Sequence, residues 1–230
     1  MNSENRSLCR DIEIRVSLFD SLSTTVPRAA TVTLGSLLGE HEVLERKASG
    51  RCFSPTVYRD GATRSNKGVD ACTAVTLDFD KMVPSDMEAV LETLRRMGYA
   101  FAAHTTYSHA PERDAAAWRV LLPISRPMTC DEQKAVWAKV SGLVGERNDA
   151  KTGDPARLWF RPACPPGREG AARVEFNEGE ILDVDSILAA RSAEGRGTKR
   201  DRLTRDAAPA APGPGVAVGG RNSRLMQLAG

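Results

Sequence analysis

Aromatic side chains, paired cysteines and long hydrophobic runs are scarce in this 230-residue chain. Aromatic residues make up 5% of it, and no segment has the glycine- and aromatic-rich strand on which RNA-recognition sheets stack bases. The 5 cysteines form no Cys-x-x-Cys pair, which argues against a zinc ribbon or a disulfide framework and favours a reducing cytoplasm. No apolar run approaches the roughly 20 residues of a membrane span. We therefore expect a cytoplasmic protein with no membrane partner.

The chain also lacks a strong charge of either sign, with 32 basic and 30 acidic residues. A nucleic-acid surface must then be a local basic patch and not a property of the whole molecule. The length and the hydrophobic content of 41% allow one sizeable core. We expect one folded domain over residues 1–192, a basic and then Ala/Pro/Gly-rich flexible linker over 193–219, and the start of a truncated C-terminal helical domain over 220–230.

Two aspartates stand near the end of one strand-like run, residues 73–80. Strict alternation places the apolar side chains of this run on one face and Asp78 and Asp80 on the other. Two adjacent carboxylates repel each other unless a cation lies between them, and Mg²⁺ or Mn²⁺ prefers oxygen ligands of this kind. An isolated Asp-x-Asp is nevertheless more often a solvated strand end, so a metal site needs further support from the rest of the chain.

Hydrophobic periodicity and capping signals predict the order of helices and strands. Ser85 and Glu88, and again Thr129 and Glu132, have capping-box spacing before apolar residues at helical intervals. The expected elements are a strand over 11–19, a short helix over 34–44, a basic loop over 51–70, the aspartate strand, a helix over 84–98, strands over 99–109 and 118–124, a helix over 129–145, strands over 158–161 and 173–176, and a helix over 184–191.

From the aspartate strand onward this order reads β-α-β-β-α-β, with the last strand at 158–161. We therefore predict an α+β fold, an RRM-like antiparallel sheet with both helices on one face and with N-terminal α/β additions. The other face of the sheet would be free for chemistry, and it would carry the two aspartates.

A third carboxylate is expected opposite the first two, because two metal ions that serve phosphoryl transfer are held between shared carboxylates. The candidates are Asp149 and Asp154, and the sequence leaves the choice open. Asp154 could instead form a salt bridge with Arg157, which would leave Asp149 as the ligand.

Other polar residues could hold the phosphates of a nucleotide. Ser108 and His109 follow the second strand of the unit and could donate hydrogen bonds, although a surface histidine without a role is equally common. The candidate arginines for the phosphates are Arg119, Arg157 and Arg161, and the basic segment before the aspartate strand offers Arg51, Arg64 and Lys67 to template or nucleotide.

These residues resemble the archaeo-eukaryotic primase superfamily, in particular the primase-polymerase domains of plasmid, phage and mobile-element replication proteins. The matching motifs are 77–80 (Leu-Asp-Phe-Asp), 105–109 (Thr-Thr-Tyr-Ser-His) leading into 118–127, and Asp149 with 154–162. In the family the second motif has Ser, one residue and then His, and Tyr107 occupies the place of that serine here.

The resemblance implies that residues 1–192 are a catalytic domain, a DNA primase or polymerase that acts on a single-stranded DNA template with nucleoside triphosphates as substrates. It implies Mg²⁺ or Mn²⁺ on Asp78, Asp80 and Asp154 in a two-metal site, with Asp149 also among the catalytic residues, and a nucleotide contact at His109. It also implies a replicative helicase as a partner, in the same or a neighbouring chain.

Two rival functions remain open. A metal-dependent nuclease or relaxase-type replication initiator would also use clustered aspartates, although relaxases usually pair histidines and the chain has only 3, none of them adjacent. A non-catalytic RRM-like nucleic-acid-binding module would need no clustered carboxylates, which repel a polyanion.

Overall fold

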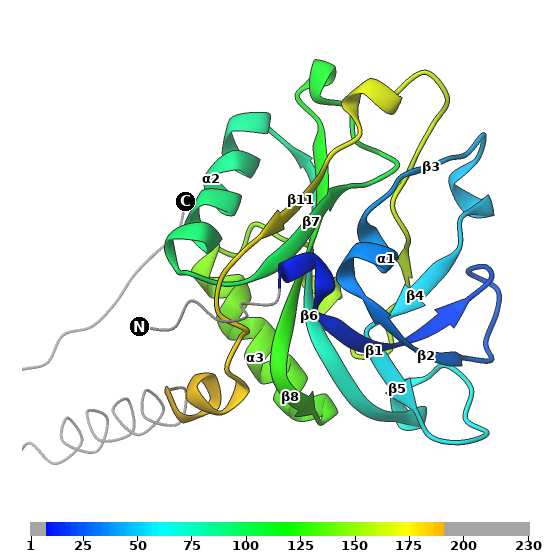
Figure 1. Ribbon diagram of the computed structural model, residues 1–230, viewed down its shortest axis with the longest axis vertical. Coiled ribbons are helices and arrows are strands. Elements are labelled where there is room, and N and C mark those ends of the chain that lie inside the picture. Colours follow the sequence, from blue (N-terminus) through cyan, green and yellow to red (C-terminus); the bar gives the residue numbers. More distant parts are fainter. Residues whose placement is uncertain (1–7, 191–230) are drawn as a thin grey trace, which may run out of the picture. The chain divides into compact units, whose positions relative to one another are not determined.

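The main sheet has five strands in the order β11-β7-β8-β6-β5, and all neighbouring strands are antiparallel. This computed structural model describes residues 8–190 (Figure 1). The strands are β5 (Thr56–Tyr58), β6 (Val69–Met82), β7 (Phe101–Thr105), β8 (Ala116–Met128) and β11 (Val174–Asn177).

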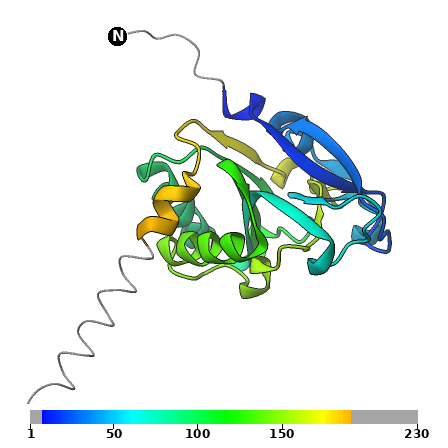
Figure 2. The same cartoon turned by 90° about the horizontal axis from the view of Figure 1, so that it is seen from below.

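Two helices cover one face of the main sheet, as Figure 2 shows for α3. They are α2 (Pro84–Arg96) and α3 (Cys130–Leu143). The apolar side chains of β6, Val75, Leu77 and Phe79, are fully buried against this helical layer. The alternation predicted for the aspartate strand is therefore confirmed, and so is the α+β fold with an antiparallel sheet and both helices on one face.

A second sheet covers the other face, in the order β2-β1-β4-β9. Ala74 of β6, Ala102 of β7 and Leu121 of β8 pack there against residues of the second sheet, such as Val16 and Trp159. The elements of this lobe are η1 (Cys9–Asp11), β1 (Glu13–Phe19), β2 (Arg28–Thr33), α1 (Leu34–Leu38), β3 (Glu42–Val43), η2 (Lys47–Ser49), β4 (Cys52–Ser54), η3 (Asn66–Gly68), β9 (Trp159–Phe160) and β10 (Ala163–Cys164). The prediction that this face is free was wrong, because a second sheet is packed on it.

The strand that closes the main sheet was also misassigned. Residues 159–160 pair with β4 in the second sheet, and β11 closes the main sheet beside β7. Both segments are short and apolar, and sequence alternation alone says nothing about which sheet a strand joins. The βαββαβ order of the main unit is kept, with β11 as its last strand.

Local predictions differ in outcome. The capping box of α3 is confirmed, since the Thr129 side chain accepts from the Glu132 N–H and the Glu132 carboxylate accepts from the Thr129 N–H. The capping box predicted for α2 was wrong, because this helix begins after Val83 and has no side-chain cap. Proline at the first helical position explains the earlier start, since proline lacks an N–H and its φ suits the first turn.

Other boundaries also moved. The helix expected over 34–44 is the five-residue α1, and the loop expected over 51–70 contains β4 and β5. Strand β8 continues through Pro127 to Met128, and the loop before it contains η4 (Pro111–Arg113). Residues 184–190 are helical, as expected. The linker over 193–219 and the segment 220–230 lie outside the described residues.

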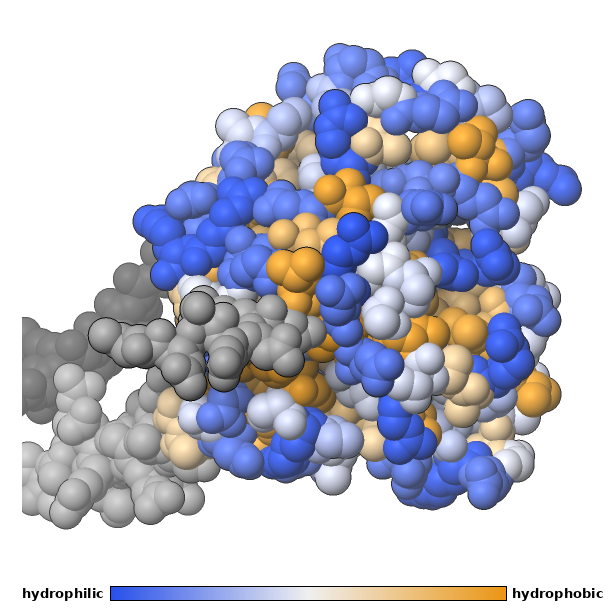
Figure 3. Space-filling view, viewed as in Figure 1, coloured by the Kyte–Doolittle hydropathy of each residue, from blue (hydrophilic) through white to orange (hydrophobic). Residues whose placement is uncertain are grey.

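On the part of the surface that Figure 3 shows uncovered, hydrophobic residues are mixed with hydrophilic ones. The most exposed large hydrophobic residue of the described part is Val26, at 68%. No helix within residues 8–190 is both long and apolar enough to cross a bilayer.

Candidate active site

A buried ion pair lies near the end of β6, where Asp78 and Arg119 are opposite each other in the β6–β8 register. The Arg119 Nε and Nη2 atoms donate to Asp78 Oδ1 at 3.0 and 2.8 Å. Both side chains are only 9% exposed, so each charge depends on the other for its compensation. The second oxygen of the Asp78 carboxylate is not used by Arg119.

The second sheet holds Arg119 in place. Its Nη1 donates to the Phe160 carbonyl oxygen at 3.0 Å, and its guanidinium lies 4.6 Å from the centre of the Trp159 ring. Arg157 stands 5.3 Å from the same ring. The Trp159 indole of β9 therefore contacts both Arg119 and Arg157, two of the arginines predicted to bind phosphate. Arg119 in turn pairs with Asp78 of the acidic strand.

Asp80 differs from Asp78 in exposure and in pairing. Its side chain reaches solvent, and it forms no ion pair with a described residue. The pKa of Asp80 is raised, first by desolvation and then by the negative charges of Asp78 and Asp149, against the opposing effect of Lys47 and Arg119. Burial therefore contributes most to this rise in pKa, and the neighbouring carboxylates add to it.

Asp149 lies next to Asp78 and Asp154 does not. The Asp149 N–H donates to the Asp78 carbonyl oxygen at 2.9 Å. The Asp149 carboxylate begins η5 (Ala150–Gly153) by accepting from the Lys151 N–H at 2.9 Å, and it pairs with Arg157 Nη2 at 3.4 Å.

Asp154 faces a small cavity that Thr56, Cys72 and Thr76 also line. One oxygen of its carboxylate accepts from the Ala156 N–H at 3.2 Å. The salt bridge considered between Asp154 and Arg157 is absent from the described residues, because Arg157 pairs with Asp149.

The donor set suits a hard cation, although no ready-made site is formed. Among residues 8–190 no group of three or more His, Cys, Asp or Glu side chains is arranged to hold a metal ion. The unused oxygen of Asp78, the unpaired Asp80 carboxylate and the raised pKa of Asp80 nevertheless fit a divalent ion, because a cation there would relieve the repulsion. The metal remains a prediction.

A cavity of about 500 Å³ in the second lobe has more basic than acidic residues in its lining, and we call it the basic cavity. Arg51 and Arg161 both line it, together with Arg10, His41, Glu40 and Glu42, and Arg51 pairs with Glu42 at 3.5 Å. Arg161 donates to the carbonyl oxygens of Ser36 and Leu37, and burial followed by the Arg51 charge lowers its pKa. Two residues that were predicted for separate roles thus share one cavity.

Arg64 and Lys67 lie elsewhere. The Arg64 Nε is buried without a partner among the described residues. Burial raises the pKa of Cys52 to about 11 and that of Tyr58 to about 12, and the nearby Arg64 charge opposes both rises in part. Lys67 is exposed in η3. Neither is among the charges that act on Asp80. Lys47, the first residue of η2, is the lysine that does so.

His109 lies on the helical side of the main sheet. Its ring packs edge-on against Trp118 at 6.0 Å, and Trp118 borders the core under α2 and α3. Because neighbouring residues of a strand face opposite ways, Trp118 and Arg119 point to opposite faces. Ser108 is exposed. The structure therefore does not bring His109 to the face of the carboxylates.

The histidine on the carboxylate face is His104, which the sequence analysis missed. It is opposite Arg119 in the β7–β8 register and only 1% exposed. Burial and the Arg119 charge lower its pKa to about 3, so it is neutral at pH 7. His41 stacks edge-on against it at 6.1 Å and bonds to Thr105.

His104, Arg119 and Asp78 thus form a row across three strands. Alternation from Ala100 and Ala102 could have placed His104 on this face, but the row depends on register, which the sequence does not show.

The fold and this site define an α+β domain with an acidic strand end set between two sheets. A model of the VapE N-terminal domain family matches residues 49–194, which is more than half of the chain, and the chain belongs to this family. That family is associated with primase-polymerase replication proteins, so the family-level prediction is confirmed.

Among solved structures, the AEP domain of the cyanophage S-2L primase-polymerase is similar, with 16% sequence identity and a TM-score of 0.43. The match covers 78% of this chain and 88% of that chain, and at this TM-score it carries no argument about function. None of the curated proteins matches.

Proposed function

We propose that this domain is a nucleotidyltransferase, a DNA primase or polymerase that extends strands on a single-stranded DNA template. The observation that carries the proposal is the acidic strand end, where the exposed Asp80, with its raised pKa and no ion-pair partner among the described residues, stands two positions from a buried, ion-paired Asp78. Family membership supports it, since the family is associated with replication proteins.

In this proposal Asp78, Asp80 and Asp149 hold divalent metal, Mg²⁺ or Mn²⁺. The metal supplies electrostatic stabilisation of the charge that develops on a transferring phosphoryl group. Arg119 fixes the direction of the Asp78 carboxylate through the hydrogen bonds to Oδ1. The proposal leaves out Asp154, which lines the small cavity beside Cys72.

The basic residues beside the strand end bind the polyanionic substrates. Lys47 and Arg157 act near Asp80 and Asp149, and Arg51 and Arg161 line the basic cavity of the second lobe. A nucleoside triphosphate has the charge to match these cations, and the cavity is large enough for a small ligand. A helicase partner and a role in mobile-element replication are part of the proposal through the family alone.

The nuclease remains the second candidate, since the same carboxylates could serve hydrolysis. The described residues show no feature that favours it over transfer. Incubation of labelled single-stranded DNA with Mg²⁺ or Mn²⁺ and no nucleotides separates the two, because only a nuclease shortens the strand under those conditions.

The test is primer synthesis on single-stranded template with ribonucleotides or deoxynucleotides and either metal, read as product lengths on a gel. Asp80→Asn removes the unpaired charge without disturbing an ion pair, and we expect it to abolish synthesis. Asp70→Asn is the matched control, because Asp70 is an exposed aspartate at the start of the same strand. Synthesis that persists in Asp80→Asn at the wild-type rate would end the proposal.

A further inference from the structure

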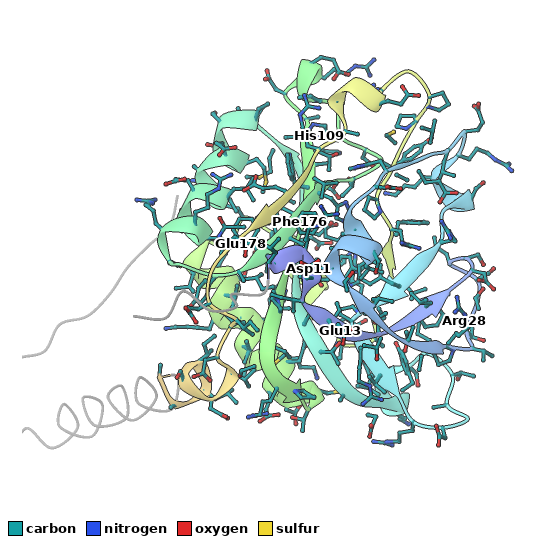
Figure 4. The ribbon with its side chains drawn as sticks, in the orientation of Figure 1. Asp11, Glu13, Arg28, His109, Phe176 and Glu178 are labelled. Atoms are coloured by element: carbon teal, nitrogen blue, oxygen red, sulfur yellow. The ribbon has the colours of Figure 1, made fainter. Side chains whose placement is uncertain are left out.

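A second cavity, of about 520 Å³, lies on the helical side of the main sheet, and we call it the His109 cavity. Its lining comes from the start of α2, from the hairpin that carries η4, from β8 and from the segment that carries η6 (Glu169–Ala171). Figure 4 shows His109 at this end of the molecule. The cavity does not share a wall with the acidic pair, since none of the three site aspartates lines it.

The walls of the His109 cavity are apolar and partly flat. Trp118, Met87 and Leu91 line it from the sheet and from α2, and prolines line it at 84 and 111. Such walls suit a planar aromatic ring, which can stack on or pack edge-on against the indole and the proline rings.

One directional donor faces this apolar lining. The Ala117 N–H donates to His109 Nδ1 at 3.1 Å, so in the neutral ring the proton is on Nε2. His109 is 9% exposed, and burial lowers its pKa, which favours the neutral form. No hydrogen bond of Nε2 to a described residue exists, so Nε2–H is available to a bound acceptor.

Three charged residues line the cavity, namely Glu88, Glu112 and Arg173. Glu88 shares Arg95 with Glu92 and Glu175, and Glu112 is paired with Arg168 at 3.2 Å. Arg173 donates Nη1 to the carbonyl oxygens of Gly170 and Ala172, and it has no acidic partner within residues 8–190. An anionic group on the ligand would therefore find an unpaired guanidinium.

The rim is also fixed before a ligand arrives. Arg168 donates to the His109 carbonyl oxygen at 3.1 Å as well as pairing with Glu112, so one side chain ties the η6 segment to the η4 hairpin. A preformed pocket binds without the cost of ordering its walls.

We propose that the His109 cavity is a second nucleotide site. The aromatic base of the nucleotide packs against Trp118 and accepts a hydrogen bond from His109 Nε2–H, and its phosphate pairs with Arg173. That the aromatic anion is a nucleotide rests on the proposed function; the cavity itself is argued from its own residues. The nucleotide can be a free mononucleotide or the end of a strand, because both present one base and one phosphate.

The experiment measures binding of adenosine monophosphate to residues 1–230 by calorimetry in the presence of a chelator, so that divalent metal cannot load the acidic face. Adenosine, ribose 5-phosphate and a 5′-phosphorylated oligonucleotide are the comparison ligands. We expect the monophosphate to bind more tightly than either fragment, and tighter binding of the oligonucleotide would identify a strand end as the source.

Gly170→Phe is designed to fill the cavity. A Cβ at Gly170 meets nothing within 4 Å, so the substitution adds a ring at the rim without a clash at its base. We expect it to weaken binding at least tenfold, and Gly170→Ala is the size control, with unchanged affinity. His109→Asn keeps an acceptor for the Ala117 N–H and removes the Nε2 donor, and we expect a loss of about threefold to tenfold.

Asp80→Asn separates the two claims. Unchanged monophosphate binding in this variant, with primer synthesis lost, supports both the second site and the proposed function. Binding lost in Asp80→Asn but kept in Gly170→Phe would overturn the second site and leave the proposed function standing. No binding by the wild-type protein at millimolar monophosphate would also overturn it.

Discussion

The two faces of the main sheet carry different side chains at the same end of strands β6 and β8. On the face toward the second sheet, charges dominate, with Asp78 and Arg119 buried as a pair and Asp80 unpaired among the described residues. The neighbouring residues of the same strands face the helices, where Phe79 belongs to the apolar core and Trp118 packs against it. Burial lowers the pKa of His109 on this side, which favours its neutral form. Alternation along β6 and β8 places these two sets of side chains on opposite faces. The same end of the two strands therefore has a charged site on one face and an apolar site on the other.

The largest effect is expected from breaking the buried pair. Asp78→Ala leaves the Arg119 guanidinium buried without compensation, and we expect a loss of about 3–5 kcal/mol in the free energy of unfolding. Denaturant titration measures it. Asp70→Ala, an exposed change on the same strand, should cost no more than about 0.5 kcal/mol.

The double variant Asp78→Leu/Arg119→Met sharpens this result, since replacing both partners with apolar residues removes the unpaired charge. It should recover most of the stability lost in Asp78→Ala. If Asp78→Ala alone is as stable as the wild type, the pair is not buried as described. For the same reason Asp78→Ala is a poor probe of catalysis, because lost activity could follow from lost stability.

A smaller effect is expected on the helical face, where one capping box is formed and the other is not. Thr129→Ala removes the side-chain cap of α3 and should cost about 1 kcal/mol. Ser85→Ala should change the free energy of unfolding by less than half of that, because α2 begins without a side-chain cap. Equal losses in the two variants would contradict the helix starts.

The smallest effect concerns pH and Asp80. Its folded-state pKa is raised, so the protonated carboxyl contributes stability below the unfolded pKa, and that stability is lost as pH rises through the folded pKa. Asp80→Asn should therefore melt slightly higher than the wild type at pH 7 in chelator, with no difference below about pH 4. A melting temperature that is lower in Asp80→Asn at pH 7 would show that Asp80 has a stabilising partner.

The sequence predicted what depends on neighbouring residues. The alternation of β6, the capped start of α3 and the β-α-β-β-α order each follow from spacing within one segment, and all are present. The candidates Asp149 and Asp154 lie five residues apart, on either side of η5. Asp149 bonds to Asp78 through its backbone N–H, whereas Asp154 lines the small cavity beside Cys72.

What depends on register and on packing between distant segments was not predictable. The row of His104, Arg119 and Asp78 depends on the register of three paired strands. A shift of one strand by one residue would place its side chain on the other face of the sheet. Strand β9 joined the second sheet and brought Trp159 over Arg119, although nothing in its two residues specifies a partner. His109 follows the same strand as His104 and ends on the other face.

The acidic strand end can be tested directly by Mn²⁺ binding, measured by electron paramagnetic resonance on the wild type, Asp80→Asn and Asp70→Asn. Our account predicts that the wild type and Asp70→Asn bind Mn²⁺ alike and that Asp80→Asn binds at least tenfold more weakly. Equal binding by all three proteins would contradict the claim that Asp78 and Asp80 form a cation site.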